Sequence, residues 1–331
     1  RSRGLGDVYK RQLYNRAGLP ATAFAYFEGK QLFNEDLPTA VAAAEAAKRA
    51  EQNLPPRTPY LQVMTPLRHG AVIQRTMPVP VWGTAEAGSE VSVTFRSQSK
   101  TTTAGKDGSW KLDLDPLKAG GPDSIKISGS GKSLELTDVL VGEVWVGSGQ
   151  SNMAGPVRNY AKNDPTLAKL LEQVPYPRMR LMKGGPKPVW TEANEQNVGA
   201  FSAILFAFGE RLQREVDVPV GLIVGAVGGS PSGSWLSKDA YERSEACRKS
   251  LAEFVKTYDA ERALKAYEAK WAAWEKRVAE AEEKGEKPKG RKPGPLAEPG
   301  QMTRGHVGNL YEKFILSVVG YGIRGVLWDQ G

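Results

Sequence analysis

The sequence predicts an α/β domain built on a parallel sheet, preceded by a small antiparallel β-sandwich domain. From residue 137 onward, strand-like and helix-like stretches alternate, a pattern typical of a parallel sheet flanked by helices. Between residues 59 and 136, short apolar runs follow one another with only turn residues between them. Strands at this spacing favour a sandwich of antiparallel sheets. We therefore expect a first domain at 59–136 and a second at 137–331.

The sandwich domain contains short apolar runs that we expect to be strands. Val91, Val93 and Phe95 alternate with polar residues, which is the period of a half-buried strand. Asp107-Gly108 has the composition of a hairpin turn between two of the runs. The predicted strands are Ala71–Gln74, Val79–Gly83, Glu90–Phe95, Lys100–Ala104, Trp110–Asp113 and Ser124–Ser128.

Two tryptophans of this domain, Trp82 and Trp110, have two possible roles. Their rings could stack on a sugar, or they could fill the core or an interface of the sandwich. We favour the second role, and we predict no catalytic residue in this domain.

The α/β domain opens with a buried strand that ends close to a serine. Val139–Val146 is apolar and rich in β-branched residues, and the small residues 147–149 then allow a sharp turn. Ligands of open α/β sheets bind at the carboxyl ends of the strands, so Ser151 is a candidate nucleophile. A serine nucleophile also needs a base that takes its proton. The alternative is that Ser151 is the N-cap of an ordinary helix.

A helix and a second strand follow this serine. Ala200–Val216 has apolar residues at helical spacing, and Val218–Val224 reads as the next strand. Gly228-Gly229 comes directly after it and lets the backbone approach a bound carbonyl, because no side chain intervenes. A simple turn is the alternative for this glycine pair. Farther on, we expect a helix at Leu310–Val319 and a strand at Gly325–Trp328.

An insertion at about residues 237–300 separates the strand Val218–Val224 from the helix expected at Leu310–Val319. Tyr241–Glu286 is rich in Ala, Glu and Lys, and it carries Trp271 and Trp274 on one helical face. Lys284–Pro299 is rich in Pro, Lys and Gly and predicts a flexible loop. The insertion could help to select a substrate, but we favour a solvated decoration of the domain.

Composition argues against several classes of function. The net charge of +8 comes from basic residues that alternate with acidic ones, without a basic stripe, so we expect no nucleic-acid partner. Cys247 is the single cysteine, and His69 and His306 lack metal-ligand spacing, so we expect no metal site and no cofactor. No apolar run reaches the roughly 20 residues that span a bilayer. Residues 1–12 are polar, and no secretory signal is visible.

Motifs around the candidate nucleophile occur in a defined order. The first is Gly149-Gln150-Ser151-Asn152-Met153; the second comprises Phe201–Glu210, Val218–Ile223 and Val227–Trp235; the third is Ile323–Gly331. Together these stretches resemble the sialate O-acetylesterase family, a carbohydrate-esterase branch of the SGNH (GDSL-like) hydrolases. Asp329 stands where this family usually has a tyrosine. The sequence of residues 70–75 and 78–83 also resembles the small β-domain that precedes the catalytic domain in these esterases.

The resemblance implies a flavodoxin-like three-layer SGNH domain and a set of site residues. Ser151 would be the nucleophile, and its own N–H, Gly229 (or Gly228) and the Gln330 amide would form the oxyanion hole. The same resemblance implies supporting roles for Gln150 and Asn152. The catalytic histidine and its carboxylate partner would follow residue 331. We therefore expect the 331-residue chain to be C-terminally truncated and inactive or nearly so by itself.

The N-terminal region carries a second part of the resemblance. Leu13–Ala21 is similar to the closing segment of the same family, so residues 1–58 could include the tail of a preceding esterase module. An irregular leader is the alternative. Leu37–Gln52 predicts a linker helix, because it has strong helix formers and no Gly or Pro apart from Pro38 near its start.

The function implied by the resemblance is hydrolysis of acetyl esters on sugars. An O-acetylated saccharide would be the substrate, either O-acetylated sialic acid or acetylated xylan and related polysaccharides. A carbohydrate-binding scaffold without catalysis, and an esterase of lipid or small acyl esters, are the alternatives. Relatives usually act outside the cytoplasm, so we expect a periplasmic or secreted protein. The sequence leaves the oligomeric state open.

Overall fold

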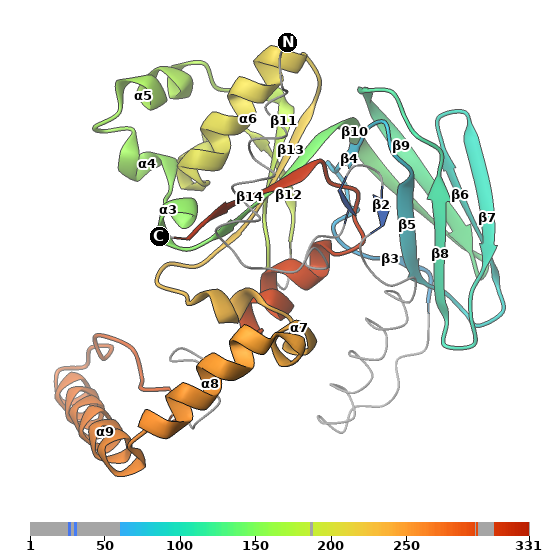
Figure 1. Ribbon diagram of the computed structural model, residues 1–331. Coiled ribbons are helices and arrows are strands. Elements are labelled where there is room, and N and C mark those ends of the chain that lie inside the picture. Colours follow the sequence, from blue (N-terminus) through green and yellow to red (C-terminus); the bar gives the residue numbers. More distant parts are fainter. Residues whose placement is uncertain are drawn as a thin grey trace. The chain divides into compact units, whose positions relative to one another are not determined.

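The computed structural model describes residues 26–27, 30–31, 60–185, 188–294, 296 and 308–330 (Figure 1). The chain forms two compact units, of which the second is Pro231–Tyr311. The first unit contains the described residues up to Ser230 and from Glu312 onward. Two short strands, β1 (Tyr26–Phe27) and β2 (Lys30–Gln31), pair antiparallel. The predicted linker helix and the segment similar to a family terminus lie outside the described residues.

Residues 60–136 contain two groups of paired strands, and each predicted apolar run overlaps a strand. β3, β5 and β8 form an antiparallel sheet, and β6 pairs with both β7 and β9 in a second one. Val81 of the first sheet and Val91 and Ile127 of the second are fully buried in the same core. The strands are β3 (Gln62–Val63), β4 (Val72–Gln74), β5 (Val79–Thr84), β6 (Glu90–Phe95), β7 (Gln98–Thr103), β8 (Ser109–Leu114) and β9 (Gly120–Gly129).

The hairpin predicted at Asp107-Gly108 is wrong. β7 pairs with β6 whereas β8 pairs with β5, so this turn carries the chain from one sheet to the other. The turn itself is tight, since Gly108 N donates to the carbonyl of Gly105 at 2.9 Å. Local composition predicted the reversal of the chain, but strand pairing depends on contacts that are distant in sequence.

Trp82 and Trp110 belong to the core, as we favoured. Their exposed fractions are 4% and 2%. Neither ring can therefore stack on a sugar in this structure.

Strand β10 (Lys132–Gly149) runs through both parts of the first unit (Figure 1). Its first half pairs antiparallel with β9 and parallel with β4. Its second half pairs parallel with β13 on one edge and with β14 on the other. The boundary that the sequence predicts after residue 136 falls within this strand.

The α/β part has the sheet order β12-β11-β13-β10, and β14 pairs with the remaining edge of β10. Helices α3 to α6 pack against one face of this sheet through a buried cluster that includes Met153, Leu205 and Leu222. The opposite face contributes Val146 and Ile223 to the core shared with the N-terminal strands. The elements are α3 (Ser151–Ala154), α4 (Val157–Tyr160), α5 (Pro165–Glu172), β11 (Tyr176–Lys183), β12 (Trp190–Ala193), α6 (Ala203–Val216), β13 (Val220–Ala226) and β14 (Gly325–Asp329).

The α-helix predicted at Leu310–Val319 is not regular. Tyr311–Ile315 forms one π-helical turn, and Leu316–Val318 forms a 3-10 turn. Ile315, Val318 and Val319 are β-branched and Gly320 comes next, a composition that lowers helix propensity.

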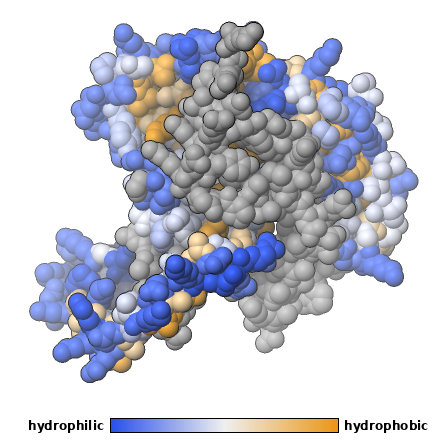
Figure 2. All heavy atoms as spheres, in the orientation of Figure 1, coloured by the Kyte–Doolittle hydropathy of each residue, from blue (hydrophilic) through white to orange (hydrophobic). Residues whose placement is uncertain are grey.

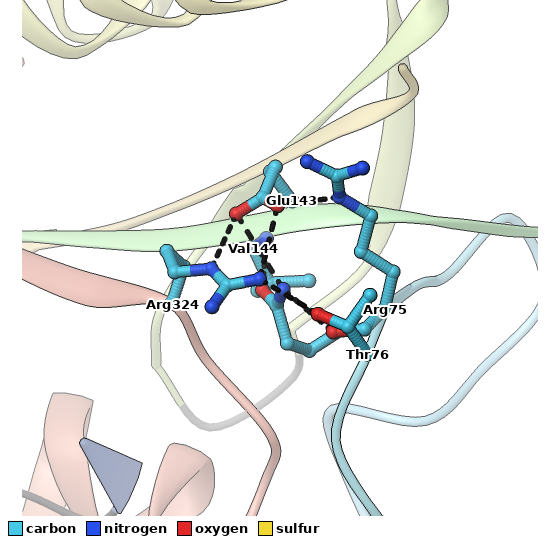
Figure 3. A network of polar contacts seen from close by, with 6 residues as sticks. Arg75, Thr76, Glu143, Val144 and Arg324 are labelled. Atoms are coloured by element: carbon cyan, nitrogen blue, oxygen red, sulfur yellow. Dashed lines mark hydrogen bonds and ion pairs between the residues drawn. The ribbon is translucent and has the colours of Figure 1, made fainter. Parts of the chain in front are cut away.

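A buried glutamate lies at the point along β10 where its paired strands change from β4 and β9 to β13 and β14 (Figure 3). Glu143 is 4% exposed, and its carboxylate accepts hydrogen bonds from Arg75 Nε at 2.6 Å and from Arg324 Nε at 2.8 Å. Arg324 also donates to Thr76 Oγ1 at 3.0 Å. Gln74 accepts from Val144 N at 2.8 Å. The network connects the end of β4, the middle of β10 and the segment that leads into β14.

Two arginines outweigh the effect of burial on this carboxyl group. Burial by itself raises the pKa of Glu143, but hydrogen bonds and charge interactions with Arg324 and Arg75 lower that pKa below its ordinary value. The carboxylate is therefore ionised at neutral pH.

The second unit is mainly helical. It contains α7 (Lys238–Arg243), α8 (Glu245–Thr257) and α9 (Ala260–Glu283). The side chains of Ser237, Ser244 and Asp259 accept backbone hydrogen bonds at the N-caps, so the predicted helical stretch is divided into separate helices. Cys247 lies in α8. Among the coloured atoms of Figure 2, which belong to described residues of both units, most are hydrophilic, with hydrophobic areas among them.

Among the residues described by the structure, no helix is both long and apolar enough to cross a membrane.

Candidate active site

Three neighbouring strands of the α/β sheet end at the same edge. Gly149 at the end of β10 pairs with Ala226 of β13 and with Asp329 of β14. The strands are parallel, so the residues that follow them share one edge of the sheet. The candidate nucleophile follows β10, the glycine pair follows β13, and Gln330 follows β14.

The turn after β10 presents Ser151 at the surface. Gly149 has a φ of +124°, and Gln150 N donates to the carbonyl of Asp329 at 2.9 Å. Ser151 is exposed and is the first residue of α3. The N-cap is Gln150, without a side-chain capping bond, so the alternative of Ser151 as an N-cap is wrong.

The glycine pair lies against the serine. A methyl group built on Gly228 would lie 3.6 Å from Ser151 Cβ, which shows how closely this backbone approaches the serine. Gly229 has a φ of +66°, in the left-handed region that favours glycine. Ser230 Oγ donates to the carbonyl of Val227 at 2.8 Å and closes the turn.

Gln330 is connected to the same turn. Its Nε2 donates to the carbonyl of Ser230 at 2.9 Å. Its Oε1 is buried and meets no hydrogen-bond donor among the described residues. A buried polar atom without a hydrogen-bond partner needs a specific explanation, and a role in function is a common explanation.

Ser230 and Met153 support these residues; both lie within the sequence motifs, but neither was predicted to have a role. Ser230 holds the Gln330 amide. Met153 is 1% exposed and anchors α3 against Ser202, whose hydroxyl lies 3.6 Å from the sulfur. A buried methionine two positions after Ser151 is visible in the sequence as an apolar residue in a polar stretch, but its partner 49 residues away is not. Asn152 is exposed, and Gln150 is half-buried beside the serine.

No histidine of the described residues lies near Ser151. His69 is exposed, and its Nδ1 accepts from Thr137 N at 3.1 Å in the first half of β10. With a rise of about 3.3 Å per residue, the strand from Thr137 to Gly149 is on the order of 40 Å long. His69 therefore cannot be the base for Ser151, and His306 lies outside the described residues. The described part of the chain also holds no cluster of three or more potential metal ligands.

The backbone at Gly149 gives a first prediction. A Cβ at this position would lie 1.9 Å from the Asp329 carbonyl oxygen, and the φ of +124° is strained for other residues. We expect Gly149→Ala to lower the free energy of unfolding by about 2–4 kcal/mol, from overpacking and backbone strain together. Urea denaturation measures this loss.

Gly228→Ala is the matched control for this variant. A Cβ there has its nearest neighbour at 3.6 Å, so we expect a loss below about 1 kcal/mol. Equal stability of the two variants would contradict the close pairing of β10 with β14.

Comparisons with known proteins agree on one family. Residues 141–263 match the family described as carbohydrate esterase, sialic acid-specific acetylesterase. The sialate O-acetylesterases of Pongo abelii and Homo sapiens are each 28% identical in an alignment of 185 residues, and each match covers 47% of this chain and 35% of the relative. The chain thus spans about a third of the length of these curated relatives.

A solved structure has a similar fold. A carbohydrate acetylesterase from Xanthomonas citri superimposes with a TM-score of 0.56 at 24% identity. The match covers 82% of this chain and 51% of that one. The fold with a large mixed sheet is therefore shared with a known carbohydrate esterase structure.

The matched region resembles a carbohydrate esterase family in sequence, and the chain resembles a solved carbohydrate acetylesterase in fold. Over residues 141–263 the chain is similar to the sialate O-acetylesterase family.

Proposed function

We infer that the protein is a carbohydrate O-acetylesterase in which Ser151 is the nucleophile. The observation that carries this inference is the meeting of Ser151, Gly228-Gly229 and Gln330 at one edge of the sheet. An exposed serine, a close glycine backbone and a side-chain amide are the groups that acyl transfer from an ester needs.

The proposed reaction has two steps. Ser151 Oγ attacks the acetyl carbonyl carbon, a base takes its proton, and the sugar hydroxyl leaves with a proton returned by that base. Water then hydrolyses the acetyl-enzyme, and acetate is released. The N–H groups of Ser151 and Gly229 and the Gln330 amide would stabilise the oxyanion, each by roughly 3 kcal/mol.

The base and its carboxylate partner are proposed to follow residue 331, as the resemblance implies. Gly228 is the alternative donor to Gly229, and Gln150 and Asn152 would support the serine turn. The mechanism uses no metal and no organic cofactor.

The finer domain assignment remains part of this proposal. We assign a β-sandwich to residues 59–136 and a flavodoxin-like SGNH domain to 137–331, with an insertion at about 237–300. The separate helical unit Pro231–Tyr311 supports the insertion, and the two N-terminal groups of strands support the sandwich assignment. A periplasmic or secreted location is proposed from the resemblance.

O-acetylated sialic acid is the substrate that we favour, because the matched curated relatives are named sialate O-acetylesterases. Acetylated xylan or a related polysaccharide is the alternative substrate. A carbohydrate-binding protein without catalysis is a second candidate function.

Acetate release from O-acetylated sialic acid and from acetylated xylan, measured side by side, tests the proposal. The protein should be produced from the extended reading frame, so that it includes the segment proposed to carry the base. Release from either substrate supports an esterase and identifies the glycan. A folded protein that binds a glycan but releases no acetate would contradict catalysis and favour the binding function.

A further inference from the structure

The second unit has a hollow on one face of α9, and nothing in the proposed reaction uses it. The hollow has a volume of about 250 Å³. Two aromatic rings, two carboxylates and a methyl group line it: Tyr267, Glu268, Trp271, Ala272 and Glu275. Ligand pockets for drug-sized molecules usually occupy about 300–1,000 Å³, so this hollow suits a smaller group.

The aromatic side of the hollow is held in place. Tyr267 and Trp271 are four residues apart and therefore on the same helical face. Their ring centroids are 6.0 Å apart, with 31° between the ring planes. Trp271 Nε1 donates to Glu275 Oε1 at 2.8 Å, which fixes the indole in one orientation. Both rings are half-buried, so they retain exposed apolar surface.

The polar side of the hollow consists of hydrogen-bond acceptors. Glu268 and Glu275 are both exposed and supply carboxylate oxygens. The Lys292 ammonium lies over the Trp271 ring, with Nζ 5.1 Å from the ring centroid. The lining residues themselves carry two negative charges and no positive charge.

We propose that this hollow is a saccharide subsite for one neutral sugar residue. The apolar C–H face of a pyranose would lie on Trp271 and Tyr267, and its hydroxyl groups would donate to Glu268 and Glu275. Two lining carboxylates disfavour an acidic sugar by charge repulsion. The choice of a saccharide rests in part on the proposed function.

Ligand-observed saturation-transfer NMR on the 331-residue chain tests the subsite. The neutral probe is unsubstituted xylotetraose, and the acidic probe is N-acetylneuraminic acid. We expect xylotetraose to bind the parent chain and Ser151→Ala equally, because neither the probe nor the hollow involves acyl transfer. Trp271→Ala should weaken this binding at least tenfold.

Trp274→Ala is the matched control. Trp274 is three residues farther along α9, its ring lies 5.7 Å from the guanidinium of Arg277, and it does not line the hollow. This variant should bind xylotetraose like the parent chain. Glu268→Gln provides a second variant with little risk to folding, since Glu268 is exposed, and it should weaken binding several-fold.

The remaining outcomes would overturn the subsite. They are the absence of xylotetraose binding, equal losses in Trp271→Ala and Trp274→Ala, and Trp271-dependent binding of the acidic probe alone. Failure here is distinct from failure of the proposed esterase, because Ser151→Ala tests acetate release without changing the hollow.

Discussion

Replacing Ser151 by alanine should lower the rate of acetate release by a factor on the order of a million. Loss of the nucleophilic serine has an effect of this size in a comparable serine hydrolase. The exposed position of Ser151 after β10, against Gly228, is the structural reason to expect it. The measurement is acetate release by the protein produced from the extended reading frame. Substrate binding should persist in Ser151→Ala.

Ser148→Ala is the control for this substitution. Ser148 is 1% exposed and donates to the carbonyl of Gly225 at 2.8 Å, so it stabilises the strand pair and lies away from solvent. We expect a loss of about 1 kcal/mol in stability and a change of only a few-fold in rate. Full activity of Ser151→Ala would refute its assignment as the nucleophile.

The 331-residue chain expressed alone should show at most residual activity. The proposed mechanism assigns the base to a position after residue 331, and a serine without its base retains little beyond binding and oxyanion stabilisation. We expect a rate at least about 10⁴-fold below that of the extended protein. A normal enzymatic rate that depends on Ser151 would contradict a base located after residue 331.

Local features of the sequence predicted the elements around the serine. The apolar run at Val139–Val146 and the small residues after it correspond to the second half of β10 and its turn. The helix and strand predicted after Ala200 correspond to α6 and β13 within a few residues. Periodicity and turn composition are local properties, and these elements depend mainly on them.

Long-range pairing could not be predicted in the same way. The crossover of β7 and β8 into different sheets depends on which strands meet, and composition at Asp107-Gly108 does not encode that choice. The hydrogen bond from Gln330 to Ser230 joins residues 100 positions apart. Glu143 did give a signal, because a charged residue within an apolar run needs a buried partner. The sequence does not reveal that Arg75 and Arg324 are those partners.

Replacing Glu143 by glutamine should lower the free energy of unfolding by about 2–4 kcal/mol at neutral pH. Breaking a buried ion pair costs about 3–5 kcal/mol, and this figure is reduced here because the side chains of Arg75 and Arg324 are 29% and 37% exposed. The variant leaves two adjacent guanidinium groups without their shared carboxylate. Urea denaturation of the parent chain and Glu143→Gln measures the difference.

The difference in free energy of unfolding between the parent chain and Glu143→Gln should become smaller at acidic pH. Because the folded protein lowers the pKa of Glu143, the stabilisation is fully present above the ordinary glutamate pKa of about 4.3 and is lost as the pH falls through the lower folded value. The exposed pair Arg211 and Glu215 supplies the control, since its side chains are 67% and 55% exposed. Glu215→Gln should cost less than about 1 kcal/mol. A loss for Glu143→Gln as small as this, or one independent of pH, would show that the buried carboxylate does not hold β4, β10 and β14 together.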